Sequence, residues 1–133
     1  MRFHEESLKV KTEKMLEVID VTEDVRQVLK RSGVTRGLLN LWVAHTTACL
    51  AVNEHEEGLW EDLLTVLTRL VPVKGEYHHK QNAHAHILSS MIKPGVSIPV
   101  VNGNMKMGTW QSILLIELDG PREREVNITV MGE

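Results

Sequence analysis

Histidine is the residue type in this sequence whose spacing most clearly points to chemistry. The chain has seven histidines, and four of them fall within nine residues: His78, His79, His84 and His86. Neutral imidazole binds transition metals, and zinc sites with an open catalytic position use three protein ligands. The cluster therefore indicates a metal site, although it equally fits solvated histidines in a polar loop.

Spacing limits which of these histidines can share one metal ion. In a helix that begins at Asn82, His84 and His86 lie about 200° apart around the axis, so only one of them can face a given site. His78 and His79, in an extended loop, point to opposite sides of the chain. The cluster therefore supplies at most two ligands, and a third must come from elsewhere.

The natural third imidazole is His45, which follows the apolar stretch 38–44. A residue at the end of a buried strand stands on a rigid scaffold where a sheet meets the surface. Thr46 and Thr47 come next, and their hydroxyls could hold phosphate oxygens. A capped core histidine between ordinary strand threonines is the alternative for this segment.

Three other segments carry groups that could act on a ligand. Asn53 and Glu54 follow the next strand, so we expect both to face the cleft of His45, with Glu54 as a metal ligand, a base or an ordinary acid at the start of a helix. The glycine-led turn 108–111 allows a close approach to a ligand or is a plain hairpin turn. The acids and arginines of 117–124 suit either phosphate binding through Arg122 or an internal salt-bridge knot.

The elements that must position these groups follow from apolar periodicity and turn residues. We expect a hairpin of the first two strands and the element order ββαββααβββ. The expected strands are 8–11, 15–20, 38–43, 48–52, 96–101, 113–118 and 126–130, and the expected helices are 22–32, 58–71 and 82–93. Runs of strands interrupted by few helices predict an α+β fold in one domain, 1–133.

Composition excludes several classes of protein. The 133 residues are 42% hydrophobic and 25% charged, as in ordinary globular domains, whereas aromatics are only 4% and the net charge is −3. These values argue against nucleic-acid binding. The single cysteine, Cys49, excludes an internal disulfide framework. Neither an apolar run of roughly 18 residues nor a signal peptide is visible, so we expect no membrane association and a cytoplasmic location.

In combination, these motifs resemble the YjbQ family, a long uncharacterised protein family also described as secondary thiamine-phosphate synthase enzymes. The resemblance covers the chain from the first strands to Gly132. The chain departs from the family pattern between the tyrosine step and Asn82, where only Lys80–Gln81 remain of a longer acidic, glycine-containing loop. The matching segments are 37–48 with His45-Thr46-Thr47-Ala48, Asn53-Glu54, Tyr77-His78-His79, 82–86, Gly108-Thr109-Trp110-Gln111 and 117–122.

The resemblance implies a sandwich of mixed, mostly antiparallel β-sheets with about three helices, and a homotrimer with sites near subunit contacts. It also implies an enzyme that joins hydroxymethylpyrimidine diphosphate to thiazole phosphate and releases pyrophosphate, an activity secondary to another role. The family's histidines fall on His45, His79 and His86, which we assign to a divalent metal ion. His45 and Glu54 are the expected catalytic residues, and the expected substrate-binding residues are Thr46, Thr47, Asn53, Trp110, Gln111 and Arg122.

The expected metal ligands do not decide which reaction the protein catalyses. Pyrophosphate chemistry prefers magnesium with oxygen ligands, whereas three imidazoles suit zinc. This mismatch favours a second interpretation, in which the native reaction is a metal-assisted hydrolysis. A third interpretation is a non-catalytic trimer that binds a metal or a small anionic metabolite, for which Glu54 would be dispensable.

Overall fold

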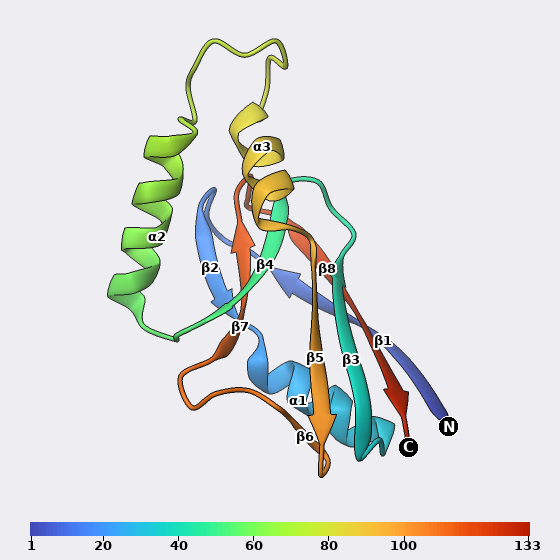
Figure 1. The fold of residues 1–133 in the computed structure, drawn as a ribbon. Coiled ribbons are helices and arrows are strands. Elements are labelled where there is room, and N and C mark those ends of the chain that lie inside the picture. Colours follow the sequence, from blue (N-terminus) through green and yellow to red (C-terminus); the bar gives the residue numbers. More distant parts are fainter.

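Eight strands form two sheets that pack face to face, and three helices pack against them (Figure 1). The computed structural model describes residues 1–133. One sheet has the order β1-β8-β3-β5-β6 and the other β2-β7-β4, with every pairing antiparallel. The strands are β1 (Arg2–Lys11), β2 (Glu17–Asp20), β3 (Arg36–Val43), β4 (Ala48–Asn53), β5 (Gly95–Val101), β6 (Asn104–Met105), β7 (Ser112–Glu117) and β8 (Glu123–Gly132), and the helices are α1 (Thr22–Ser32), α2 (Glu57–Leu70) and α3 (Ala83–Ile92). The expected α+β fold with three helices is confirmed.

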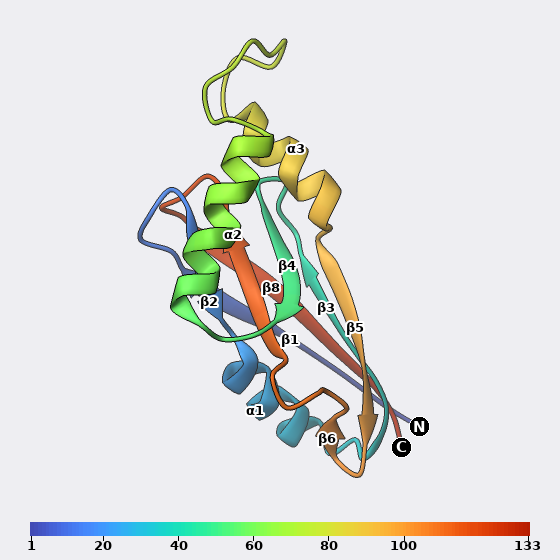
Figure 2. The same ribbon diagram turned by 60° about the vertical axis from the view of Figure 1, so that its left-hand side comes forward.

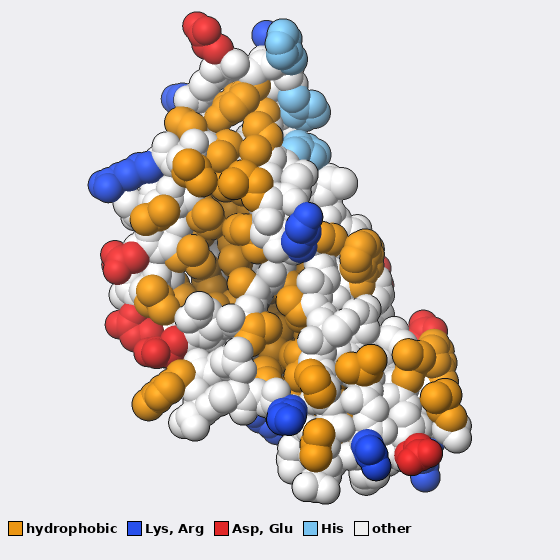
Figure 3. Space-filling view, in the orientation of Figure 1, with side chains coloured by type: hydrophobic (Ala, Val, Ile, Leu, Met, Phe, Trp, Pro, Cys, Tyr) orange, Lys and Arg blue, Asp and Glu red, His pale blue; other side chains and the backbone are white.

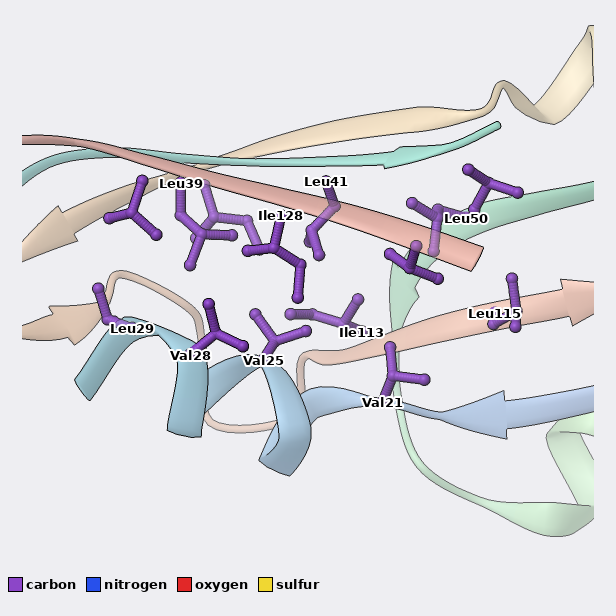
Figure 4. Packing of buried hydrophobic residues seen from close by; sticks show 14 of the residues in the cluster. Val21, Val25, Val28, Leu29, Leu39, Leu41, Leu50, Ile113, Leu115 and Ile128 are labelled. Carbon is purple, nitrogen blue, oxygen red and sulfur yellow. The ribbon is translucent and has the colours of Figure 1, made fainter. Parts of the chain in front are cut away.

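The main hydrophobic core lies between the two sheets and α1. Alternate residues of β3 and β8, such as Leu41 and Ile128, point toward α1 and β7 in Figure 4. Their neighbours along each strand face outward, which gives the period-2 pattern of a sheet with one buried face. The 18 buried residues of this cluster hold the five-stranded sheet on the smaller one.

The three-stranded sheet is buried on both faces. Ile113 and Leu115 of β7 belong to the main core, while Leu114 and Ile116 belong to a second cluster that includes residues of α2 and α3. Figure 2 shows both helices against this second face. Burial on two faces explains why β7 reads as a continuous apolar run rather than an alternating one.

Local signals located the helices within one or two residues. Gly33 ends α1 in the left-handed conformation, with φ 70°, as its position predicted. At the start of α1, Asp20 accepts hydrogen bonds from both the N–H and the hydroxyl of Thr22, the first residue of the helix. None of the three helices is long and apolar enough to cross a membrane.

The predicted hairpin of the first two strands is wrong. β1 pairs with β8, the last strand of the chain, and β2 pairs with β7 in the other sheet. The segment 12–16 therefore crosses from one sheet to the other instead of turning back on itself. Alternation of apolar residues indicates that a strand has a buried face, but it does not choose the partner strand.

Candidate functional site

Three segments that are distant in the sequence meet at one end of the sandwich and enclose a pocket of about 640 Å³. They are the β3–β4 loop, the start of α3 and the turn between β7 and β8, at the upper end of the molecule in Figure 1. The pocket is lined by Ala44, His45, Thr46, Thr47, Asn82, His86, Arg122, Glu123 and Arg124. The histidine side chains visible in Figure 3 gather at this same end.

His45 is half-buried beside the first residues of β8. Its Nε2 accepts a hydrogen bond from the backbone N–H of Glu125 at 3.0 Å. Burial lowers the pKa of His45, and the nearby Arg124 lowers it further, so the ring is neutral at pH 7. A neutral ring that accepts through Nε2 carries its proton on Nδ1. His45 therefore offers the pocket a hydrogen-bond donor.

The other two predicted metal ligands lie together without His45. The ring centroids of His79 and His86 are 4.8 Å apart and nearly perpendicular. His79 Nε2 lies 3.1 Å from the side-chain oxygen of Asn82. The chain contains no group of three His, Cys, Asp or Glu side chains spaced to share a metal ion. The predicted zinc or magnesium site at His45, His79 and His86 is therefore not formed within one chain.

The placement of α3 agrees with the prediction that only one of His84 and His86 faces a given site. His86 lines the pocket, whereas His84 is 2% exposed and its Nε2 donates to the carbonyl of Leu118 at 2.9 Å. His84 therefore ties the start of α3 to the end of β7 and stays out of the pocket.

Arg122 lies at the rim of the pocket, where the carboxylate of Asp119 holds its guanidinium in place. Its Nη2 donates to Asp119 Oδ2 at 2.9 Å, and its Nε donates to the Asp119 carbonyl at 2.9 Å. Asn82 donates to the same carboxylate oxygen at 2.7 Å. Burial alone would raise the pKa of Asp119, but the hydrogen bonds from Asn82 and Arg122 hold it below its ordinary value. The sequence analysis missed Asp119 as a positioning group, although it lies in the turn beside Arg122.

The two threonines have different roles. The hydroxyl of Thr47 is buried at the pocket and accepts from Arg124 Nη2 at 2.9 Å, so only its O–H remains for a ligand. Thr46 is exposed at the pocket. The backbone N–H groups of His45, Thr46 and Thr47 donate no hydrogen bond within the chain. These three N–H groups are donors that still lack an acceptor, and a bound ligand could satisfy them.

The remaining predicted site residues lie at the opposite end of the same sheet. In the register of β4 and β7, Ala48 pairs with Glu117 and Asn53 pairs with Ser112. At about 3.3 Å per residue, Asn53 lies roughly 17 Å from Ala48. The expectation that Asn53 and Glu54 share the cleft of His45 is therefore wrong for one chain, because the extended strand between them separates its two ends.

Trp110 and Gln111 share this distant end, since they lead directly into Ser112. Trp110 is 73% exposed, and Gln111 Oε1 accepts the N–H of Gly108 at 2.7 Å. The turn prediction for 108–111 agrees with this contact. Neither side chain lines the His45 pocket of its own chain.

Comparison with known proteins agrees with this architecture. Residues 6–133 match the family model described as UPF0047 protein YjbQ-like. A UPF0047 protein of Methanothermobacter thermautotrophicus is 38% identical over 136 residues, covering 100% of this chain and 95% of its own. A UPF0047 protein of Archaeoglobus fulgidus is 39% identical, covering 93% of this chain and 98% of its own.

Solved structures match the whole fold. A YbjQ-like protein of unknown function from Sulfolobus solfataricus superposes with a TM-score of 0.97 at 37% identity, covering 99% of each chain. A hypothetical protein from Aeropyrum pernix superposes with a TM-score of 0.96 at 45% identity, covering 98% of this chain and 99% of that one. The chain therefore belongs to the YjbQ-like UPF0047 family.

Proposed function

We propose that the chain is a thiamine-phosphate synthase-like transferase that binds phosphorylated metabolites in the His45 pocket. The observation that carries the proposal is that Arg122 and residues 45–47, whose N–H groups have no partner within the chain, line the same pocket. Glu123, a carboxylate that also lines the pocket, is paired with Lys9 at 3.5 Å. Arg122 and Arg124 are each paired with a carboxylate, Asp119 and Glu117 respectively, so the pocket presents hydrogen-bond donors rather than a net positive charge. Guanidinium and backbone N–H donors suit phosphate oxygens.

The proposed reaction joins hydroxymethylpyrimidine diphosphate and thiazole phosphate. The thiazole nitrogen forms a bond to the pyrimidine methylene carbon while the bond from that carbon to the diphosphate oxygen breaks. Negative charge develops on the leaving pyrophosphate, where Arg122, the loop N–H groups and the Nδ1–H of His45 would stabilise it. The attacking nitrogen loses no proton, so this step needs no general base, and the distant Glu54 is not required.

No step of this proposal passes through a metal ion. His45 carries its proton on the nitrogen that faces away from Glu125, and a protonated nitrogen does not ligate a metal. Divalent metal binding by His79 and His86 belongs to the alternative proposal, a non-catalytic metal- or anionic-metabolite-binding trimer or a metal-assisted hydrolase. The close approach of these two rings is the observation that favours that alternative.

Loss of Arg122 is the direct test of anion binding. We expect Arg122→Ala to weaken binding of inorganic pyrophosphate about 10- to 100-fold, because a hydrogen bond to a charged group contributes roughly 1.5–3 kcal/mol. Isothermal titration calorimetry measures the affinity, and Arg69→Ala, an exposed arginine on α2, is the matched control. Equal affinity in the Arg122 variant and the unmodified protein would refute the anion site.

Turnover separates the enzyme from its alternatives. Mixing the two phosphorylated substrates with the protein should release pyrophosphate and form the joined product at a rate that falls in Arg122→Ala. Tight binding of both substrates without any product would favour the non-catalytic binding protein. Release of phosphate from one substrate alone would favour the hydrolase.

We further propose that the chain forms a homotrimer in which a neighbour completes the site. Trp110 is 73% exposed and stands at the end of the sheet opposite the His45 pocket. Four side chains at that end, Asn53, Glu54, Trp110 and Gln111, can reach a His45 pocket only if the pocket belongs to another copy. Such a head-to-tail contact gives a closed trimer when each copy is rotated by a third of a turn.

The mass of the protein in solution tests the proposed trimer directly. Light scattering should give a mass of about 45 kDa, three times the 15.1 kDa chain, and Trp110→Ala should shift the mass toward that of the single chain. Trp60→Phe, at a partly buried tryptophan outside the exposed turn, is the matched control. A single-chain mass at every concentration would refute the trimer.

A further inference from the structure

A buried ion pair forms the floor of the His45 pocket. Glu117 is 0% exposed and Arg124 1%, and they are the only charged residues among the buried polar ones. Arg124 Nε donates to Glu117 Oε1 at 2.8 Å, while Arg124 Nη2 donates to Glu117 Oε2. This two-point contact fixes the plane of the guanidinium beneath the pocket that Arg124 lines.

The Arg124 guanidinium also donates hydrogen bonds to the β3–β4 loop, while its Nη1 stays without a partner in the chain. Arg124 Nη2 donates to the carbonyl of Thr47 at 3.1 Å and to its hydroxyl at 2.9 Å. Arg124 Nη1 makes no hydrogen bond within the chain, whereas the buried side-chain polar atoms without partners are His84 Nδ1 and Ser89 Oγ alone. The Arg124 side chain is only 2% exposed but lines the pocket, so Nη1 is the guanidinium nitrogen left free for a ligand there.

The carboxylate of Glu117 holds the opposite wall. Its Oε2 accepts the N–H of Asp119 at 3.1 Å, and its Oε1 accepts the hydroxyl of Thr12 at 2.7 Å. The Thr12 oxygen in turn accepts the N–H of Arg122 at 2.8 Å. Through these bonds the pair fixes the turn that carries Arg122.

Such a pair is a poor means of adding stability. Removing two charges from water offsets most of their attraction, and an apolar pair of similar volume is often at least as stable. The rest of β7 is apolar, with Ile113, Leu114, Leu115 and Ile116 all buried. The charged pair lies only where the strand reaches the pocket. Its remaining hydrogen bonds are made with the β3–β4 loop and with the turn that carries Arg122.

We propose that Glu117 and Arg124 position the β3–β4 loop and the Arg122 turn, and that Arg124 Nη1 is a second fixed cationic contact for the bound anion. This inference rests on the proposed function. Two guanidinium groups and three free N–H groups provide enough donors for two phosphoryl groups. The pocket therefore selects a diphosphate over a monophosphate, since a single phosphate cannot use all the donors at once.

The test compares inorganic pyrophosphate with inorganic phosphate. The unmodified protein should bind pyrophosphate at least about tenfold more tightly. Arg124→Lys keeps the positive charge but loses the planar fork, so we expect pyrophosphate affinity to fall about tenfold while phosphate affinity changes less. Arg69→Lys on the surface of α2 is the control, and circular dichroism reports whether each variant is folded.

A ligand-free measurement separates positioning from binding. In Arg124→Lys, amide hydrogen exchange should accelerate at Leu118 and Asp119, whose N–H groups bond Thr47 and Glu117, and should stay slow at the core residue Leu115. Glu117→Gln, which keeps the side-chain volume and one acceptor oxygen, should show the same local change and serves if Arg124→Lys does not fold.

Each outcome decides the inference. A folded Arg124→Lys protein with unchanged pyrophosphate affinity and unchanged exchange would overturn it. If the unmodified protein binds neither ion, the proposed function and the ligand contact of Arg124 both fail, and the exchange result alone then decides whether the pair positions the loops.

Discussion

Replacing Glu117 by alanine should lower the free energy of unfolding by about 3–5 kcal/mol, because it leaves the charge of Arg124 buried without a partner. Glu117 is 0% exposed, and Arg124 has no other carboxylate within reach. The hydroxyl of Thr12 and the N–H of Asp119 would lose their acceptor as well. Urea denaturation followed by circular dichroism measures the change.

Two controls identify the buried charge as the cause. Glu57→Ala, at an exposed position in the first turn of α2, should change the stability by less than about 0.5 kcal/mol. Removing both charges in Glu117→Met with Arg124→Met should cost less than Glu117→Ala alone. A loss below about 1 kcal/mol in Glu117→Ala would show that Arg124 reaches water when its partner is removed.

The same carboxylate predicts a dependence of stability on pH. Burial by itself would raise the pKa of Glu117, but hydrogen bonds from Arg124, Thr12 and Asp119 outweigh it and hold the pKa below 4.5. Because the folded pKa lies below the unfolded one, this contribution is complete above about pH 4.5 and is lost as the pH falls through the folded pKa. Glu117→Gln should therefore flatten the decline of stability in acid.

Truncation of Ile128 to alanine should lower the free energy of unfolding by about 2–5 kcal/mol. Ile128 is 0% exposed on the middle of β8, where it lies between Glu6 of β1 and Leu41 of β3. Its side chain points into the core shared by α1 and β7 (Figure 4). The rigid strands on both sides cannot close the resulting cavity.

The neighbouring residue on the same strand supplies the control. Thr129 faces the other side of the five-stranded sheet and is only partly buried, so Thr129→Ala should cost less than about 0.5 kcal/mol. Both variants can be compared in one chemical denaturation series. An Ile128→Ala loss no larger than that of Thr129→Ala would contradict the assignment of Ile128 to the rigid core.

Much of the fold could be predicted because its signals are local. The left-handed turn at Gly33, the apolar run of β7 and the amphipathic period of α2 each act within a few residues. Pro99 has no N–H to donate, and β6 pairs with β5 only beyond it, at Val100 and Val101. Pairing of β1 with β8 involves residues more than a hundred positions apart, and no local pattern encodes it.

For the site, residue types and spacing pointed to His45, and the family resemblance added His86 and Arg122; the three residues line one pocket. Only the tertiary structure decided that Asn53 and Trp110 stand at the far end of the sheet, because the register of β4 with β7 sets that separation. The tertiary structure also decided that the hydroxyl of Thr47 accepts a hydrogen bond from Arg124 and that the ring of His45 accepts one from the N–H of Glu125. Which atoms of a side chain remain free depends on the distant groups that reach it. Sequence thus determined which chemical groups are available, and packing between distant segments determined which of them share a ligand.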